Sequence, residues 1–420
     1  METALYCSVK TILVFSVNFG KCANVYIFAY CTNTMNKPMI DLSQFESISP
    51  YTDAEASEAL SKLADHPAVG IASHNFFPQE SPDFLKNILK QIKTVDQFQE
   101  MVMSRFVQWV IDNKAHNFSY DGISNIDPNK TFLALSNHRD IILDPAITQL
   151  VLHNNGLPMT EIAVGDNLIS SKEIEYLIRS NRMIKVIRGV SARELYLSSQ
   201  MLSKYIRINI TNQRRSIWLA QRQGRTKDGF DTTEQGLLKM LDMSGQGDFQ
   251  QNFEELNITP MSISYEIEPC DILKAREIVI SRTQKYVKAK GEDFNSIMVG
   301  IMQQKGNIHL HIGKPLTTEE IAQAAMCDKN DRYQLIRNAV DKRVIEGYKL
   351  WSNNYIAYDI LKQTDKYASM YTAEEKAKFL GYMEYQLGTV ESEINREELK
   401  EVFLGIYANP VVSKETLAAN

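Results

Sequence analysis

The chain of 420 residues has few cysteines and no pattern that would pair them or make them metal ligands. No two cysteines form a CxxC pair, and none stands at zinc-ligand spacing from a histidine. The sequence therefore argues against a disulfide framework and a structural zinc site, and a reducing compartment is expected. The five cysteines are Cys7, Cys22, Cys31, Cys270 and Cys327.

After residue 34 the chain also lacks an apolar run long enough to cross a bilayer. Residues 1–34 are apolar in part, but Lys10 and Lys21 interrupt them and no small-residue cleavage site follows. Neither a membrane span nor a secretory signal is therefore expected. The segment that begins at Met35 resembles the usual start of a protein more closely than Met1 does. We therefore predict that residues 1–34 are an extension absent from the mature protein. A membrane-attached amphiphilic leader is the alternative.

A general excess of positive charge is absent too, since the net charge is −5. Neither a basic domain nor a nucleic-acid reader motif is present, so nucleic acid is not expected as a partner. Residues 179–239 are the exception, with 13 Lys and Arg against 4 Asp and Glu. This local excess predicts an anionic ligand, either a phosphorylated substrate or an anionic bilayer.

Apolar periodicity divides the rest of the chain into three regions. Residues 35–114 and 321–420 have helical spacing, whereas 115–320 alternate strand-like and helix-like segments. The predicted fold class is therefore α/β, a mixed central sheet covered by helices with helical regions at both ends. The expected strands are Thr131–Ser136, Glu161–Val164, Met183–Ile187, Ser216–Ala220, Met261–Tyr265 and Asn307–Ile312.

Residues 132–145 place one histidine and two aspartates in a short turn between a buried strand and a helix. Pro145 fits the first position of that helix. An imidazole accepts a proton from a hydroxyl best when a carboxylate orients it, so His138 is a candidate general base. Its partner is either Asp140 or Asp144. The alternative is that Asp144 only caps the helix and His138 is a hydrogen-bonded core residue.

The segment Ser216–Gly229 predicts an apolar strand that runs into a basic loop containing glycine. Arg222, Arg225 and Lys227 carry the positive charge, and Gly224 lets the backbone approach a ligand closely. The planar guanidinium group matches the oxygens of a phosphate. We therefore predict a phosphate site in this loop; the alternative is a solvated basic loop.

Four segments resemble, in order, the sequence blocks of the glycerolipid acyltransferases, which acylate glycerol 3-phosphate or its monoacyl derivative. The first block of that family usually reads Asn-His-Arg/Gln-x-x-x-Asp. Ordered blocks at domain-like spacing are more specific than any single motif, and these fall within residues 115–320. The four segments are Ser136–Asp144, Met183–Gly189, Ser216–Gly229 and Ile258–Tyr265.

The resemblance implies an acyltransferase-like fold and direct transfer of a fatty acyl group from acyl-CoA or acyl carrier protein to a glycerol phosphate or lysophospholipid. In such an enzyme His138, steered by Asp144 or Asp140, removes the proton of the acceptor hydroxyl. No metal or further cofactor is implied, and a cytoplasmic location with peripheral contact at the inner face of the membrane is expected. The residues implied for the acceptor phosphate are Arg188, Arg222, Gln223, Gly224 and Arg225.

Two positions depart from the family pattern. Five residues separate His138 from Asp144, one more than usual, and only one separates it from Asp140. Asp144 aligns better because a helix follows it. Gln223 stands where the family has a glutamate, and an amide carries no charge and accepts no proton. These departures favour the alternative of a catalytically silent lipid-binding protein. A hydrolase of lipids or thioesters is a further alternative, although no Gly-x-Ser-x-Gly motif is present.

His309 and His311 stand two residues apart in the last expected strand, so they share one of its faces. Two imidazoles on one face can bind a metal, but the sequence shows no third ligand. We therefore predict a structural role for both.

Overall fold

The computed structural model describes residues 13–17, 25–29 and 42–419. The chain divides into two compact units, Met1–Gln44 and Phe45–Asn420. In the first unit, β1 (Leu13–Val17) pairs antiparallel with β2 (Val25–Ala29). The predicted extension, residues 1–34, otherwise lies outside the described residues, and so does Met35. That prediction stays untested.

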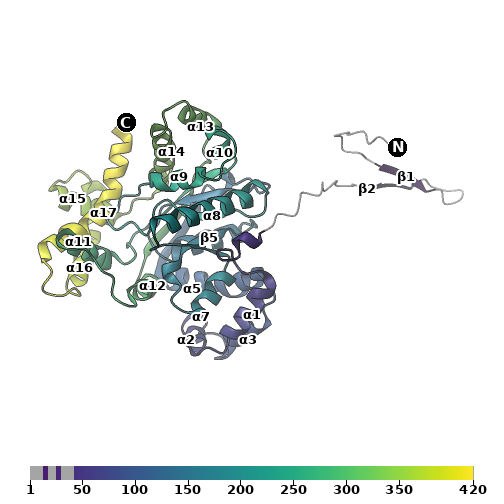
Figure 1. Cartoon of the computed structure of the whole chain (residues 1–420). Coiled ribbons are helices and arrows are strands. Elements are labelled where there is room, and N and C mark those ends of the chain that lie inside the picture. Colours follow the sequence, from purple (N-terminus) through teal and green to yellow (C-terminus); the bar gives the residue numbers. More distant parts are fainter. Residues whose placement is uncertain (1–12, 18–24, 30–41, 420) are drawn as a thin grey trace. The chain divides into compact units, whose positions relative to one another are not determined.

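The second unit is built on a mixed seven-stranded sheet of order β3-β9-β8-β4-β7-β5-β6 (Figure 1). All neighbouring pairs are parallel except β8 and β9, which run antiparallel. The sheet, the covering helices and the helical ends confirm the predicted α/β fold class. The strands are β3 (Ala115–Asp121), β4 (Leu133–Ser136), β5 (Glu161–Gly165), β6 (Met183–Val186), β7 (Ile217–Ala220), β8 (Ile258–Tyr265) and β9 (Gly306–Ile312).

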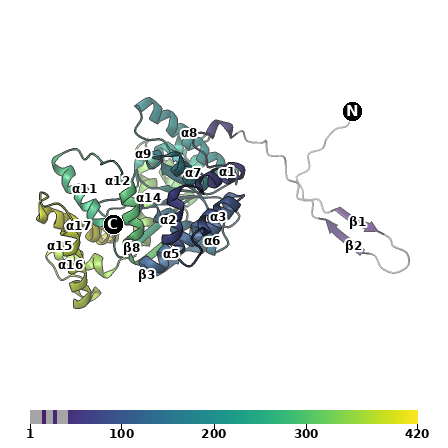
Figure 2. The same ribbon diagram turned by 90° about the horizontal axis from the view of Figure 1, so that it is seen from below.

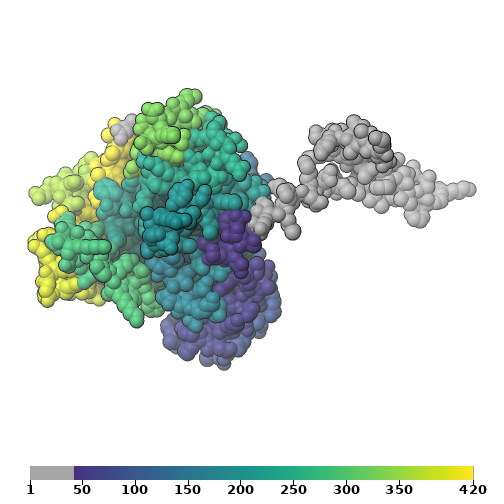
Figure 3. Space-filling model, viewed as in Figure 1, coloured from purple at the N-terminus to yellow at the C-terminus, as the bar shows by residue number. Residues whose placement is uncertain are grey.

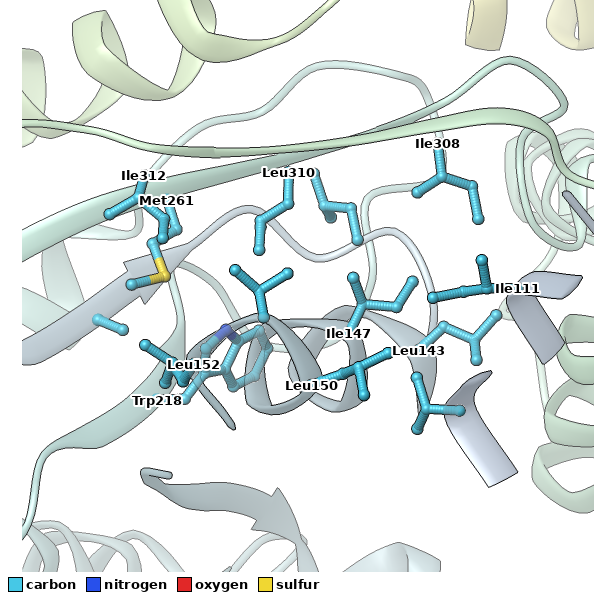
Figure 4. Close-up of a cluster of buried hydrophobic side chains, with 14 of the residues drawn as sticks. Ile111, Leu143, Ile147, Leu150, Leu152, Trp218, Met261, Ile308, Leu310 and Ile312 are labelled. Carbon is cyan, nitrogen blue, oxygen red and sulfur yellow. The ribbon is translucent and has the colours of Figure 1, made fainter. Parts of the chain in front are cut away.

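One face of the sheet holds the main hydrophobic core, under α5 (Ser104–Lys114) and α6 (Leu143–Asn154). Figure 4 shows Leu143, Ile147 and Leu150 of α6 pointing toward side chains of the sheet. Leu310 of β9 and Trp218 of β7 are among those partners and are buried. Since each fully buried large apolar side chain contributes roughly 1.5–3 kcal/mol, this layer fixes α6, and hence the loop before it, on the sheet.

The opposite face of β8 and β9 is polar and lies under α14 (Asp331–Gly347). Successive strand residues point to opposite faces, so Ser264 and His309 alternate with the apolar residues of the core. The long helix α8 (Ala192–Thr211) begins with a capping box in which Ser191 and Glu194 satisfy each other's backbone amides.

The N-terminal helical region contains α1 (Asp53–Leu63), α2 (Pro67–Phe76), α3 (Phe84–Gln91) and α4 (Val95–Phe98). A π-helical turn, Gln99–Met103, joins α4 to α5. Residues 82 and 83 form a turn, and α3 begins at Phe84 after Asp83, whose side chain makes no cap bond. A serine before proline often caps a helix that starts at the proline, but Ser81 and Pro82 do not form such a start here.

The C-terminal helices, together with α11, enclose a second apolar cluster. Figures 1 and 2 show this region away from the N-terminal helices, and on the face drawn in Figure 3 the middle of the chain separates the two. Within the described residues, no helix is both long and apolar enough to cross a membrane. The helices of this cluster are α11 (Asp271–Thr283), α15 (Ser352–Lys362), α16 (Ala373–Leu387) and α17 (Arg396–Ala419).

Candidate active site

The loop between β4 and α6 brings His138 and Asp144 together at the centre of the sheet. The Nδ1 atom of His138 lies 2.9 Å from Oδ2 of Asp144, and the imidazole is 14% exposed. In open α/β sheets, ligands bind outside the carboxyl ends of the strands, which is where this loop lies. The contact leaves Nε2 as the ring nitrogen available to a ligand.

Asp144 is buried but fully engaged by hydrogen-bond donors. Its Oδ2 also accepts hydrogen bonds from the backbone amides of Arg139, at 2.6 Å, and Asp140, at 2.9 Å. Its Oδ1 accepts one from the hydroxyl of Tyr265, at 2.8 Å. Burial and the nearby Asp144 carboxylate raise the pKa of Tyr265 well above its usual value, so the phenol keeps its proton and acts as the donor.

Asp140, the other candidate partner, does not hydrogen-bond to the imidazole and instead organises the helix start. Its Oδ1 accepts hydrogen bonds from the amides of Ile142 and Leu143, both at 2.8 Å. Helix α6 begins at Leu143, so the expectation that Pro145 holds the first helical position is wrong. The capping role weighed for Asp144 is therefore filled by Asp140.

Arg139 anchors the loop between β4 and α6 to the protein interior, and its side chain is fully buried. Its Nη2 donates to Asp231 at 2.5 Å, and its Nη1 donates to Glu268 at 3.3 Å. Lys274 donates to the carbonyl oxygen of Arg139 at 2.8 Å, and the guanidinium lies 4.7 Å from the ring centre of Tyr348. Because these charges are paired in the interior, removing one partner would leave an uncompensated buried charge.

The basic loop of the third segment lies against the histidine loop. The amide of Thr226 donates to the carbonyl oxygen of His138 at 2.8 Å. Among the described residues, the buried Nε of Arg222 and the buried Nη1 of Arg225 have no hydrogen-bond partner. Lys227 differs from them because it pairs with Glu277. These two nitrogens are unsatisfied donors of the kind that bind an anion, and they lie in the loop that contacts the histidine loop.

Two predicted residues of the same loop play smaller parts. Gln223 is exposed. Gly224 has a φ of +74°, and a Cβ atom there would meet nothing within 4 Å. The glycine is therefore required by the left-handed backbone rather than by a close approach, contrary to the reason given from the sequence.

Arg188, from the second segment, lies two residues beyond the end of β6. Its backbone amide donates to Asp166 at 3.1 Å. Burial lowers the pKa of Arg188, while the carboxylates of Asp166, Glu234 and Asp293 oppose that shift. The pKa of Asp293, in the first turn of α12 (Glu292–Met302), is lowered against the effect of burial by hydrogen bonds from Lys288 and Asn167, and to a smaller extent by the charge of Arg225. Arg188 and Arg225 therefore both lie within electrostatic range of Asp293.

An apolar pocket opens beside the histidine loop, between the π-helical turn and α6. Ile142 and Ala146 line it next to the helix start, and Met103 and Met183 line it from the N-terminal region and β6. π-Helical turns are frequent at functional sites, so the irregular helix beside this pocket is consistent with a binding role.

Two neighbours of the candidate site received no role from the sequence. Tyr265 ends β8, the parallel neighbour of β4. Its hydroxyl group at the end of an otherwise apolar strand could have indicated a role in the site. Arg139 adjoins His138, but its partners Asp231 and Glu268 are distant in the sequence, and no pattern connected them.

No protein-family model matches this sequence, and no curated protein matches it. One solved structure to which the chain is similar is described as the 1-acyl-sn-glycerophosphate (LPA) acyltransferase, PlsC, from Thermotoga maritima. The sequence identity is 12%, the TM-score is 0.38, and the match covers 71% of this chain and 96% of that one. A likeness at this level does not establish membership of a family.

Proposed function

We propose that this protein is an acyltransferase that moves a fatty acyl group from a thioester to the hydroxyl of a glycerol phosphate or 1-acylglycerol phosphate. The observation that carries the proposal is the His138–Asp144 pair, whose loop contacts the loop of Arg222 and Arg225, where Nε and Nη1 have no hydrogen-bond partner among the described residues. A general base and an anion site are the two elements that such a transfer needs from the protein.

In the proposed reaction, Asp144 accepts the Nδ1 proton of His138 in a hydrogen bond and so presents Nε2 as the base. Nε2 takes the proton of the acceptor hydroxyl as its oxygen attacks the thioester carbonyl. The tetrahedral intermediate then collapses, the carbon–sulfur bond breaks, and the leaving thiolate takes the proton from the imidazolium. The products are an ester and a free thiol, with no further co-reactant.

Arg225 and Arg222 bind the acceptor phosphate in this proposal, with Arg188 contributing charge from the second segment. Gln223 has no charge and is exposed, so we assign it and Gly224 to shaping the loop rather than to proton transfer.

The apolar pocket lined by Ile142, Ala146 and Met103 has a volume of only about 30 Å³, so we assign to it only the carbons of the acyl chain nearest the thioester. Because this pocket begins at the start of α6, an acyl chain in it would leave its thioester carbonyl near the histidine loop. The acyl chain of the donor, and that of 1-acylglycerol phosphate as acceptor, imply peripheral contact with a membrane surface at the cytoplasmic face.

The proposal is tested by incubating the full chain with labelled acyl-CoA or acyl carrier protein and three acceptors: glycerol 3-phosphate, 1-acylglycerol 3-phosphate and unphosphorylated monoacylglycerol. Lipid products are identified by mass. We expect a new ester on a phosphorylated acceptor. Release of free fatty acid alone would instead indicate a hydrolase, and retention of lipid without turnover would indicate a binding protein; either result contradicts the proposal.

A further inference from the structure

Three potential metal ligands meet on the polar face of the sheet, on strands β3 and β9. His309 and His311 come from β9, and Asp121 comes from the end of β3. One ligand atom from each lies within 4.8 Å of the others. No third ligand was apparent from the sequence because β3, which supplies the carboxylate, has no apolar run that would predict a strand.

The separations of these atoms suit a single small cation. Oδ2 of Asp121 lies 3.6 Å from Nε2 of His309, and Oδ1 lies 2.5 Å from Nδ1 of His311. Two ligand atoms on one tetrahedral zinc ion lie roughly 3.3 Å apart, given bonds of about 2.0–2.1 Å. The carboxylate of Asp121 is 59% exposed, so it can turn away from His311 by the roughly 0.8 Å that the ion requires.

Both imidazoles are already oriented. Nδ1 of His309 lies 2.8 Å from the hydroxyl oxygen of Ser119, and when that oxygen accepts the ring proton, Nε2 holds the free lone pair. The ring of His311 packs on Gly347, where a Cβ atom would come within 2.2 Å of ring carbon Cδ2. A hydrogen bond to the remote ring nitrogen is the usual companion of a metal-binding histidine.

We propose that Asp121, His309 and His311 bind a divalent transition-metal ion of the zinc class. Two imidazoles and one carboxylate are ligands that such ions favour, with water completing the coordination. Because the ligands come from β9 and from β3, which is an edge strand, the ion stabilises the attachment of that edge.

The surrounding charges define how strong this site is. Lys349 is the cation whose charge acts on the ring of His309. The ammonium group of Lys349 also repels a cation. Lys349→Ala should therefore tighten metal binding, by roughly three- to tenfold at moderate salt.

The experiment is a titration of the full chain, first freed of metal with a chelator, with Co²⁺ followed by visible absorption and with Zn²⁺ followed by calorimetry. We expect one saturable ion per chain and a rise in the melting temperature. Asp121→Asn and His309→Ala should each weaken binding by more than tenfold. His116→Ala, which removes an exposed histidine from the same strand β3, should leave binding unchanged.

Asp121→Asn keeps the side-chain shape at an exposed position, so its fold is checked by circular dichroism before titration. Absence of saturable Co²⁺ binding by the wild-type chain overturns the proposal. Binding that survives both Asp121→Asn and His309→Ala does so too, since the ion then lies elsewhere. His138→Ala should bind Co²⁺ normally, so this test stands apart from that of the acyltransferase.

Discussion

Oδ2 of Asp144 accepts from Nδ1 of His138 and from two successive backbone amides, those of Arg139 and Asp140. The carboxylate therefore positions the imidazole and folds the loop that carries it. This double role explains why the partner of His138 is the aspartate six residues away rather than the one two residues away.

Asp144→Asn is expected to lower the rate of acyl transfer by about 10²- to 10⁴-fold, because an amide cannot stabilise the imidazolium formed during proton transfer. Asp140→Asn is the matched control. It keeps an oxygen for the amides of Ile142 and Leu143, and its rate should fall by less than about tenfold. Steady-state kinetics of the two variants shows which aspartate is the partner of His138. Equal and mild losses of rate in both would count against Asp144.

Tyr265→Phe removes the phenol that donates to Oδ1 of Asp144 without changing the packing. Because Tyr265 is a positioning residue, the variant should have a kcat about tenfold lower than that of the wild type, with KM for both substrates unchanged. The free energy of unfolding should fall by about 1.5–3 kcal/mol, since a hydrogen bond to a charged group is lost. Urea denaturation measures the second effect, and a loss of stability with normal kcat would remove the positioning role.

Arg225→Ala should raise KM for a phosphorylated acceptor by about tenfold or more, which corresponds to about 1.4 kcal/mol or more of lost binding. KM for the acyl donor should stay within about twofold. Lys227→Ala is the control, because Lys227 pairs with Glu277 and is not available to the phosphate. If both variants raise KM equally, the effect is one of general charge and the phosphate site is not at Arg225.

Lys305 is buried, and its ammonium group donates to the carbonyl oxygen of Gln303. Burial lowers the pKa of Lys305 to about 8, below the 10.5 of an ordinary lysine. Between these pH values the unfolded chain binds the extra proton, so the free energy of unfolding rises with pH. The contribution is fully present above 10.5 and is lost as the pH falls through 8.

Lys305→Met should remove that dependence. The difference in unfolding free energy between wild type and variant should change by up to about 3 kcal/mol from pH 8 to 10.5 in favour of the wild type. Chemical denaturation across this pH range measures it. Parallel curves for the two proteins would show that the pKa of Lys305 is not lowered by burial.

The sequence predicted the six strands that are apolar, because burial on the sheet leaves a run of large aliphatic residues. It missed β3, an edge strand whose side chains are only partly covered and mostly polar, such as Asn117 and Ser119. Edge strands need no continuous apolar run. The omission also hid the carboxylate that completes the cluster around His309.

The candidate site was predictable where its parts are adjacent in the sequence. His138 and its two possible aspartates were found, but the choice between them depends on how the loop turns, which no local pattern specifies. Asp231, which pairs with Arg139, lies 92 residues away. Such pairs are set by strand order, and strand order was not predicted.

The most direct test of the account is the initial rate of ester formation from acyl-CoA and 1-acylglycerol 3-phosphate by wild type and by His138→Ala, read by lipid mass. Circular dichroism should show equal folding of the two proteins. The account predicts robust transfer by the wild type and a loss of at least about 10³-fold in the variant. Comparable rates of ester formation by both proteins would contradict it.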